Sequence, residues 1–407
     1  MQEWKTYTLK DLSKGKGEYG IGASAIPFDK DKLIYLRITD INDDGTLNKS
    51  GLTSVDAVDA SKYLLEKNDI VFARTGNSTG RSYFYDGSDG PLVYAGFLIR
   101  FRLDDSKFNP RILKYYSHSK PYYDWVQSFD TGGTRGNINA KTYGDMPITL
   151  PPRHVQDRIV DILYSLDAKI ENNRRINDNL EQQIQTLYRE WFIDNPKTEW
   201  ATIALSEVAT FVSGYSYKGN ELVDSSETAM ATIKNFERNG GFKLDGYKPV
   251  SPSSKLKEEQ HAELFDILVA HTDLTQNAEV IGNAEIILSK DSYRDVIFSM
   301  DLVKVVAKES FPYQFLLALL LKNPVFKSHC IGYVNGTTVL HMNKRALPDF
   351  KIQIPTCEDA ARMNEIAKSI FTKMSENLSE IANLTKLRDS LLPKLMSGEL
   401  KINEIDC

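Results

Sequence analysis

The sequence predicts an α+β fold: two mixed α/β domains in a pseudo-twofold arrangement, joined by two long antiparallel coiled-coil helices. The main observation is an apolar seam in steps of four and three residues, the spacing of a coiled coil. It runs from Ile159 to Trp191 and recurs 204 residues later from Met363 to Leu395. Each seam follows a region of short alternating apolar runs, which is typical of strands. A duplicated half that ends in a coiled-coil helix predicts two globular heads held by two helices.

The composition is that of a two-domain soluble protein. The chain has 407 residues, of which 41% are hydrophobic and 26% charged, with a formal charge of −5 and no basic tail. DNA binding would therefore need a local patch and help from a more basic partner. The longest apolar run, Phe315 to Leu321, is too short to cross a bilayer, and no signal region follows Met1. The three cysteines have no metal-site spacing and fit a reducing compartment, so we expect a cytoplasmic protein without membrane contact.

The chain divides into five segments. We expect a first head, a central helical segment, a second head, a C-terminal helical segment and a tail, over residues 1–150, 151–197, 198–353, 354–400 and 401–407. Alternating runs predict strands in the heads over Leu92–Phe101 and Val296–Val306, and apolar stretches predict short helices near Pro110–Trp125 and Pro312–Lys327. The long helices are expected over Val155–Ile193 and Glu358–Ser397, the second one closed by Gly398.

The heads repeat one another less regularly than the helices do. Asp69–Thr75 matches Asp266–Thr272 at an offset of 197 residues, and Met146–Pro152 matches Phe350–Pro355 at 204. The offset changes within the heads and stays constant along the seams. Heads that differ in length, joined by helices of constant length, are what a recognition protein would show.

Two loops in each head are candidates for contacts with DNA. After the strand at Asp69, a Gly-rich stretch from Gly76 to Ser82 has the wrong spacing for a nucleotide-binding P-loop, but its amides and arginines can approach a phosphate chain. A second loop, Asp130–Asn139, recurs as Asn335–Arg345, and its Asn, Arg and Thr side chains can contact base edges and phosphates. The alternative for every one of these loops is an ordinary surface turn. The candidate DNA contacts are Arg74, Asn77, Thr79, Arg81, Thr131, Thr134, Arg135, Asn137, Asn139, Lys141, His271, Asn335, Thr337, Thr338, His341, Asn343, Lys344 and Arg345.

The chain shows no catalytic or metal-binding motif, so we expect no catalytic group and no metal. Asp167 and Lys169 are expected to lie on a solvated helix surface. The seam itself is interrupted by three asparagines, Asn173, Asn177 and Asn377. In an antiparallel pair of helices they would meet near the axis and set the register at a cost in stability. Alternatively, the seam loosens there and the asparagines face water.

Several motifs, in a fixed order along the chain, make it resemble the specificity subunits of type I restriction–modification systems. The motifs are Asp69–Gly76 with Gly80, the Gly133–Pro152 stretch running into Ile159, and Leu391–Leu400, and they span nearly the whole chain. The second head departs from the first at Ala270–Leu274, which lacks the loop glycines.

The resemblance implies a non-catalytic reader of double-stranded DNA. Each head would read one half of a bipartite, asymmetric site, and the helices would set the gap between the halves. The helices would also dock two methylation subunits, which bring S-adenosylmethionine, and restriction subunits that use ATP and Mg²⁺ could join; this chain would hold no cofactor. The alternative is a coiled-coil adaptor whose heads bind proteins or glycans, and steep salt dependence would distinguish a DNA reader from it. A third interpretation, an enzyme with an unrecognised site, would require turnover by the chain alone.

Overall fold

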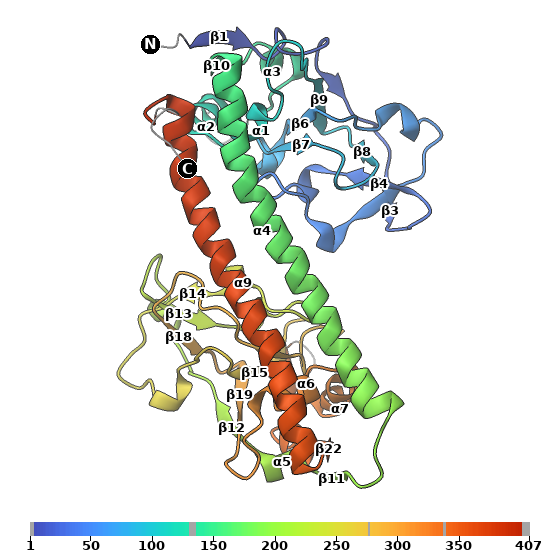
Figure 1. Ribbon diagram of the computed structural model, residues 1–407, viewed down its shortest axis with the longest axis vertical. Coiled ribbons are helices and arrows are strands. Elements are labelled where there is room, and N and C mark those ends of the chain that lie inside the picture. The colour runs from blue at the N-terminus through green and yellow to red at the C-terminus, as the bar shows by residue number, and fades with distance from the viewer. Residues whose placement is uncertain (1–3, 130–135, 276, 337–338, 401–407) are drawn as a thin grey trace. The chain divides into compact units, whose positions relative to one another are not determined.

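The computed structural model describes residues 4–129, 136–275, 277–336 and 339–400, and it has the predicted fold class (Figure 1). Two long helices stand out in Figure 1: α4 (Arg153–Tyr188, green) and α9 (Cys357–Ser397, red). The chain forms two compact units. The N-terminal unit contains Met1–Ala168 and Thr385–Cys407, and the central unit contains Lys169–Leu384. Each long helix therefore contributes a segment to both units.

The head of the N-terminal unit is built on small, mostly antiparallel sheets. The first has the order β2-β9-β6-β7, with strands Glu18–Tyr19, Leu98–Arg102, Asp69–Ala73 and Ser82–Tyr85. The second has the order β3-β5-β4-β8, with strands Ala25–Pro27, Thr53–Val55, Leu33–Leu36 and Leu92–Tyr94, and its β4–β8 pair is parallel. The first strand of the chain pairs with the last strand of the head, β1 (Lys5–Thr8) with β10 (Pro147–Leu150). This pairing closes the head just before α4 begins.

The central unit repeats this plan, which confirms the predicted internal repeat. Its larger sheet has the order β12-β19-β15-β17, with strands Ala209–Ser213, Leu302–Ala307, Ile267–Ala270 and Ala284–Ile286. A second sheet, β14-β13-β18, contains Lys248–Pro249, Thr228–Ala231 and Asp295–Phe298, again with one parallel pair. The closing pair is β11 (Ala201–Ala204) with β22 (Lys351–Ile354), as β1 is with β10. An additional small sheet, β16-β21-β20, contains Thr272–Asp273, Leu340–Met342 and Val334–Asn335.

The β2-β9-β6-β7 and β12-β19-β15-β17 sheets each carry a cation at the same place. Arg100 in β9 lies 3.5 Å from Asp69, and Lys304 in β19 lies 3.2 Å from Asp266. Arg100 and Asp69 are buried, and burial is the main reason that the pKa of Asp69 rises to about 6. The recurrence of a paired cation at matching strand positions supports the alignment of the two heads residue by residue.

The helices follow the sequence prediction closely, whereas two predicted strands are interrupted. The α-helical part of α4 ends at Tyr188 and continues as a π-helical turn over Arg189–Asp194, and α9 ends where Gly398 adopts φ +73°. The apolar run Leu92–Phe101 contains two strands, β8 and β9, with a turn between them, and Val296–Val306 is divided in the same way into β18 and β19. The short helices near Pro110 and Pro312 are each a pair: α1 (Ile112–Tyr116) with α2 (Lys120–Gln127), and α6 (Gln314–Leu321) with α7 (Pro324–Ile331).

Both units have an apolar core that includes residues of the long helices. In the N-terminal unit, Leu163 of α4 and Leu395 of α9 are buried in the same cluster as the head residue Phe101. In the central unit, Ile184 of α4 and Phe371 of α9 pack with the strand and helix residues of the second head. Within the described residues, no helix is long and apolar enough to cross a membrane.

Candidate nucleic-acid interface

The first candidate loop is a tight connection between β6 and β7. It contains a 3-10 turn over Gly76–Ser78, and it closes where the Gly80 amide donates to the Ala73 carbonyl at 3.0 Å. Gly76 and Gly80 have φ values of +73° and +89°, a region in which glycine is favoured. Tyr122 donates its hydroxyl hydrogen to the Gly80 carbonyl at 2.5 Å, so the loop is held from below by α2. The loop between β6 and β7 is therefore an ordered turn held by these hydrogen bonds.

The structure brings the two candidate loops of the first head together. The Ile138 amide donates to the Arg74 carbonyl at 3.0 Å, and the Thr79 hydroxyl donates to the Gly136 carbonyl at 3.2 Å. Asn139 caps α3 (Ala140–Gly144) by accepting from the Thr142 amide at 2.9 Å. Four candidate contacts in this region are exposed: Asn77, Asn137, Asn139 and Lys141. Thr131, Thr134 and Arg135 lie outside the described residues.

The two arginines of the first loop have different surroundings. The Arg74 guanidinium lies 5.1 Å from the centre of the Tyr19 ring, and its Nε is buried without a hydrogen-bond partner among the described residues. Arg81 is already engaged, because it lies 2.6 Å from Asp43 and donates to the Ile41 carbonyl at 3.1 Å. Arg74 is therefore the better placed of the two to contact a ligand.

The second head has the same arrangement around His271. The Met342 amide donates to the His271 carbonyl at 2.9 Å, just as Ile138 does to Arg74. His271 directly precedes β16, which pairs with β21 so that Thr272 faces His341. Five candidate residues gather there at exposed positions: Asn335, His341, Asn343, Lys344 and Arg345. Thr337 and Thr338 lie outside the described residues.

Burial and the neighbouring cations lower the pKa of His271. Burial contributes most, and His341 and Lys344 add to it because they disfavour a further positive charge. Asp301 opposes this effect. His271 therefore stays neutral to a lower pH than an isolated histidine would, and its imidazole can both donate and accept a hydrogen bond.

The second-head loop differs from the first in how it is held. The first head uses two glycines with positive φ, whereas the second uses one, Gly282 at φ +79°, together with the carboxylate of Asp273 as an acceptor. This carboxylate accepts from the amides of Thr275, Val280 and Ile281 at 2.7, 2.6 and 3.1 Å. These hydrogen bonds contribute to the low pKa of Asp273, although burial opposes the shift. The departure seen in the sequence thus corresponds to a different local construction.

Comparison with known proteins shows which family the chain resembles. Residues 1–182 match the family described as Type I restriction modification DNA specificity domain. The HindI specificity subunit of Haemophilus influenzae is 24% identical, with 98% of this chain and 100% of that relative covered. The MjaIX specificity subunit of Methanocaldococcus jannaschii is 23% identical over 72% of this chain and 69% of its own length. The chain is therefore similar to type I restriction–modification specificity subunits over nearly its whole length.

A solved structure of a specificity subunit shares the fold. The crystal structure of the type-I restriction-modification system S subunit from M. genitalium matches with a TM-score of 0.56 at 17% identity, covering 97% of this chain and 96% of the other. The resemblance noted in the sequence is thus confirmed at the level of family and fold. The DNA contacts of individual residues stay predictions.

Two of the seam asparagines, Asn177 and Asn377, contact each other within the central unit. Asn377 donates through Nδ2 to Oδ1 of Asn177 at 2.8 Å, and Asn177 donates to the Met374 carbonyl at 3.2 Å. Asn173 donates to Glu380 at 2.8 Å. As the α4 residue number rises from 173 to 177, the α9 partner falls from 380 to 374, so the two helices are antiparallel here. Their effect on register stays a prediction.

The expectation that Asp167 is solvated was wrong. Its side chain is 13% exposed and accepts hydrogen bonds from Lys114 at 2.7 Å, Tyr115 at 3.0 Å and Arg388 at 3.1 Å. Burial disfavours ionisation of this carboxyl, but the two cations outweigh it and hold its pKa below the usual range. Lys169, by contrast, is half-exposed and pairs with Glu380.

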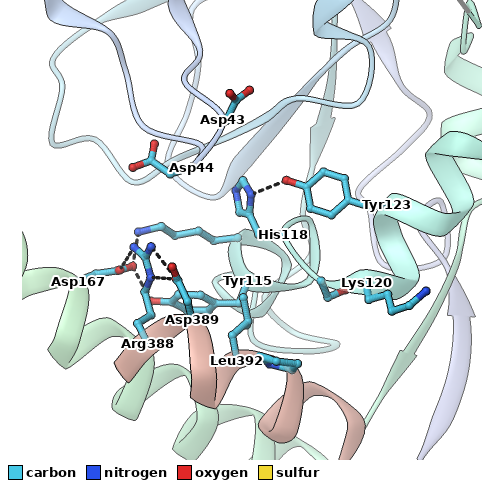
Figure 2. Close-up of a pocket in the computed structure, with 13 residues that line it drawn as sticks. Asp43, Asp44, Tyr115, His118, Lys120, Tyr123, Asp167, Arg388, Asp389 and Leu392 are labelled. Carbon is cyan, nitrogen blue, oxygen red and sulfur yellow. Dashed lines mark hydrogen bonds and ion pairs between the residues drawn. The ribbon is translucent and has the colours of Figure 1, made fainter. Parts of the chain in front are cut away.

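Asp167 lies in the wall of a cavity of about 490 Å³ in the N-terminal unit (Figure 2). Figure 2 shows Asp167 and Arg388 on one side, the carboxylates of Asp43 and Asp44 on another, and His118 bonded to Tyr123. Desolvation lowers the pKa of His118 to about 4. The cavity is lined on one side by Asp43, which pairs with Arg81, and on the other by residues of α4 and α9 in this unit.

Sequence reasoning missed the partners of several site residues. Arg388 is the one charged residue in the seam of α9, and this exception was a signal that it has a partner. Tyr19 carried no comparable signal, because it is far from Arg74 in the sequence. Within the described residues, no group of His, Cys, Asp or Glu side chains could hold a metal ion, and the expectation of no metal and no catalytic group stays a prediction.

Proposed function

We propose that this chain is the DNA-recognition subunit of a type I restriction–modification complex, in which each head reads one half of a bipartite, asymmetric site. The similarity to type I specificity subunits supports the role as a DNA-recognition subunit. The observation that supports a reading role for both heads is a repeated contact between the two candidate loops. In the first head the Ile138 amide donates to the Arg74 carbonyl, and in the second the Met342 amide donates to the His271 carbonyl. Arg74 and His271 occupy matching backbone positions, and the exposed amide and cationic side chains of both candidate loops surround them. The adaptor alternative is not favoured.

The division of labour within the complex follows from this role. Two methylation subunits dock on the helical segments and bring S-adenosylmethionine, while restriction subunits bring ATP and Mg²⁺. The chain has a formal charge of −5, so its partners contribute much of the charge that neutralises the DNA phosphates. It holds no cofactor and performs no chemistry itself, and the complex works in the cytoplasm.

Methylation mapping tests the proposal. Genomic DNA from the host strain, with and without this gene, is compared for methylated adenines. The expected result is the loss of one bipartite motif when the gene is deleted and its return on complementation. An unchanged methylation pattern in a strain that expresses the methylation subunits would refute the proposed function. Methyl transfer or cleavage by the purified chain without partners would refute the non-catalytic role.

Salt titration then tests the location of the interface. The assembled complex is bound to DNA carrying the mapped motif, and log K is followed against log salt. Lys344→Ala should reduce the slope by about one unit if Lys344 contacts a phosphate. Lys257→Ala is the matched control, because Lys257 is an exposed lysine of the same unit outside the candidate loops. Equal slopes for wild type and Lys344→Ala would remove Lys344 from the interface.

A further inference from the structure

The two heads can be aligned through the hydrogen bonds of β9 and β19. Tyr19 pairs with Ile99 of β9, and Ser213 pairs with Val303 of β19. Val303 lies 204 residues after Ile99. The glycines that follow confirm the match, since the amides after Tyr19 and Ser213 donate to Leu98 and Leu302 at 3.2 and 3.3 Å. Tyr19 and Ser213 therefore hold equivalent places.

A second and a third pair of positions follow from the same alignment. The Arg74 amide donates to the Phe97 carbonyl at 3.1 Å, and the His271 amide donates to the Asp301 carbonyl at 2.8 Å. Arg74 and His271 also accept from equivalent residues of the second loop, as described above. Each head thus has one triplet of residues next to its candidate loops. We name them the aromatic triplet (Tyr19, Arg74 and Phe97) and the polar triplet (Ser213, His271 and Asp301).

The aromatic triplet offers hydrogen-bond donors beside exposed rings. The Arg74 guanidinium lies over the Tyr19 ring at 5.1 Å, which limits the orientations that its planar donor group can adopt. Phe97 is 55% exposed and Tyr19 is 43% exposed, although large aromatic side chains are usually covered. Such a group suits a guanine, which presents two acceptors in the major groove, next to a base that offers an apolar surface such as the thymine methyl.

The polar triplet offers acceptors in the same place and has no aromatic ring. Asp301 accepts from the Thr272 hydroxyl through Oδ1 at 3.0 Å, and it is close enough to His271 to influence its pKa. Ser213 is exposed. A carboxylate suits a base that presents an amino group, cytosine or adenine, and it repels an approaching guanine edge, which carries only acceptors in the major groove.

We propose that these two triplets determine the difference between the half-sites: the aromatic triplet selects a guanine through Arg74, and the polar triplet selects an amino-bearing base through Asp301. This inference rests on the proposed function. It adds four positions to the candidate contacts, and it explains how one duplicated fold can read an asymmetric site. The backbone of the loops is alike in the two heads. The side chains at three matching positions differ, so each head presents different hydrogen-bonding groups to the major groove.

Single substitutions in the assembled complex test this proposal. Arg74→Lys keeps the charge but loses the planar pair of donors, so methylation should become less selective at one base of one half-site, with about a tenfold or greater loss in preference. Asp301→Asn should relax one base of the other half-site. Arg111→Lys is the matched control, because Arg111 lies 4.3 Å from the Tyr164 ring in the same unit but outside the candidate loops.

The outcomes separate this inference from the proposed function. If the wild-type complex methylates no bipartite motif, the proposed function fails. If it does, but Arg74→Lys and Asp301→Asn both keep the motif and its rate, the triplet assignment fails and the function stands. A uniform loss across all sequences would instead make Arg74 a phosphate contact and also overturn the assignment. Thermal unfolding and complex assembly are measured for each variant, and Phe97→Leu, an exposed apolar replacement, provides a second test on the same half-site if Arg74→Lys fails to assemble.

Discussion

The contact between Asn177 and Asn377 predicts the sign of the coupling free energy in a double-mutant cycle. Asn377 is 1% exposed, and its side-chain amide donates to Asn177 at 2.8 Å. Asn177→Leu alone removes that acceptor and leaves a buried donor unpaired, which should destabilise the protein by about 1–3 kcal/mol. Asn377→Leu alone should cost less, about 0.5–1.5 kcal/mol, because Asn177 is only half-buried and keeps its bond to the Met374 carbonyl.

The double variant should recover most of this loss. It leaves no amide unpaired and buries two leucine side chains, each of which stabilises by up to about 1.5–3 kcal/mol. Overpacking by the larger side chains offsets part of the gain, by about 1–3 kcal/mol. We therefore expect the double variant to be more stable than either single variant and at least as stable as the wild type. The coupling free energy should be about 1–3 kcal/mol.

Thermal and urea unfolding measure these changes, at about 2–4 °C of Tm per kcal/mol for a unit of this size. Asn179→Leu is the matched control, since Asn179 is an exposed asparagine of the same helix and its replacement should change stability by less than about 0.5 kcal/mol. A double variant destabilised by the sum of the single effects would refute the reasoning, because it would show that the two asparagines do not depend on each other. Loss of the polar pair should also weaken the register, so methylation of the bipartite motif should become less faithful.

Three other measurements follow from the structure. Asp167→Asn should lower the free energy of unfolding by about 1–3 kcal/mol near neutral pH, and because the pKa of Asp167 is depressed, the difference from wild type should shrink as the pH falls through that pKa and below; a constant difference would contradict this. Gly80→Ala should destabilise more than Gly76→Ala, because both have positive φ but only a Cβ at position 80 meets another side chain, at 2.7 Å; equal Tm values would rule out the clash. Lowering the pH from neutral through the depressed pKa of His271, which lies below its ordinary value of 6.5, should strengthen DNA binding, because a protonated His271 adds a positive charge next to the DNA, and His271→Asn should lack this increase; an identical pH profile for this variant would exclude His271.

The sequence alone determined the elements that depend on local patterns. The four-and-three spacing of the seams predicted both long helices to within a few residues, and the duplication predicted two heads of the same plan. Side-chain periodicity is a local property that each segment carries by itself, which is why these predictions succeeded. The strands over Leu92–Phe101 and Val296–Val306 were predicted less well, because each run is divided by a turn of only three residues that includes an apolar one, Phe97 or Met300.

Only the tertiary structure decided which side chains meet. Arg74 lies on Tyr19, 55 residues earlier in the chain, and Asp167 accepts from Arg388, 221 residues later. These contacts depend on the path of the whole chain, so no short window of sequence contains them. The same reason explains the error at Asp167: a polar residue at a helix surface is solvated only if no other element covers it, and here α1 and α9 do. The sequence named the loops, and the folding of distant segments onto them decided which residues are free to bind.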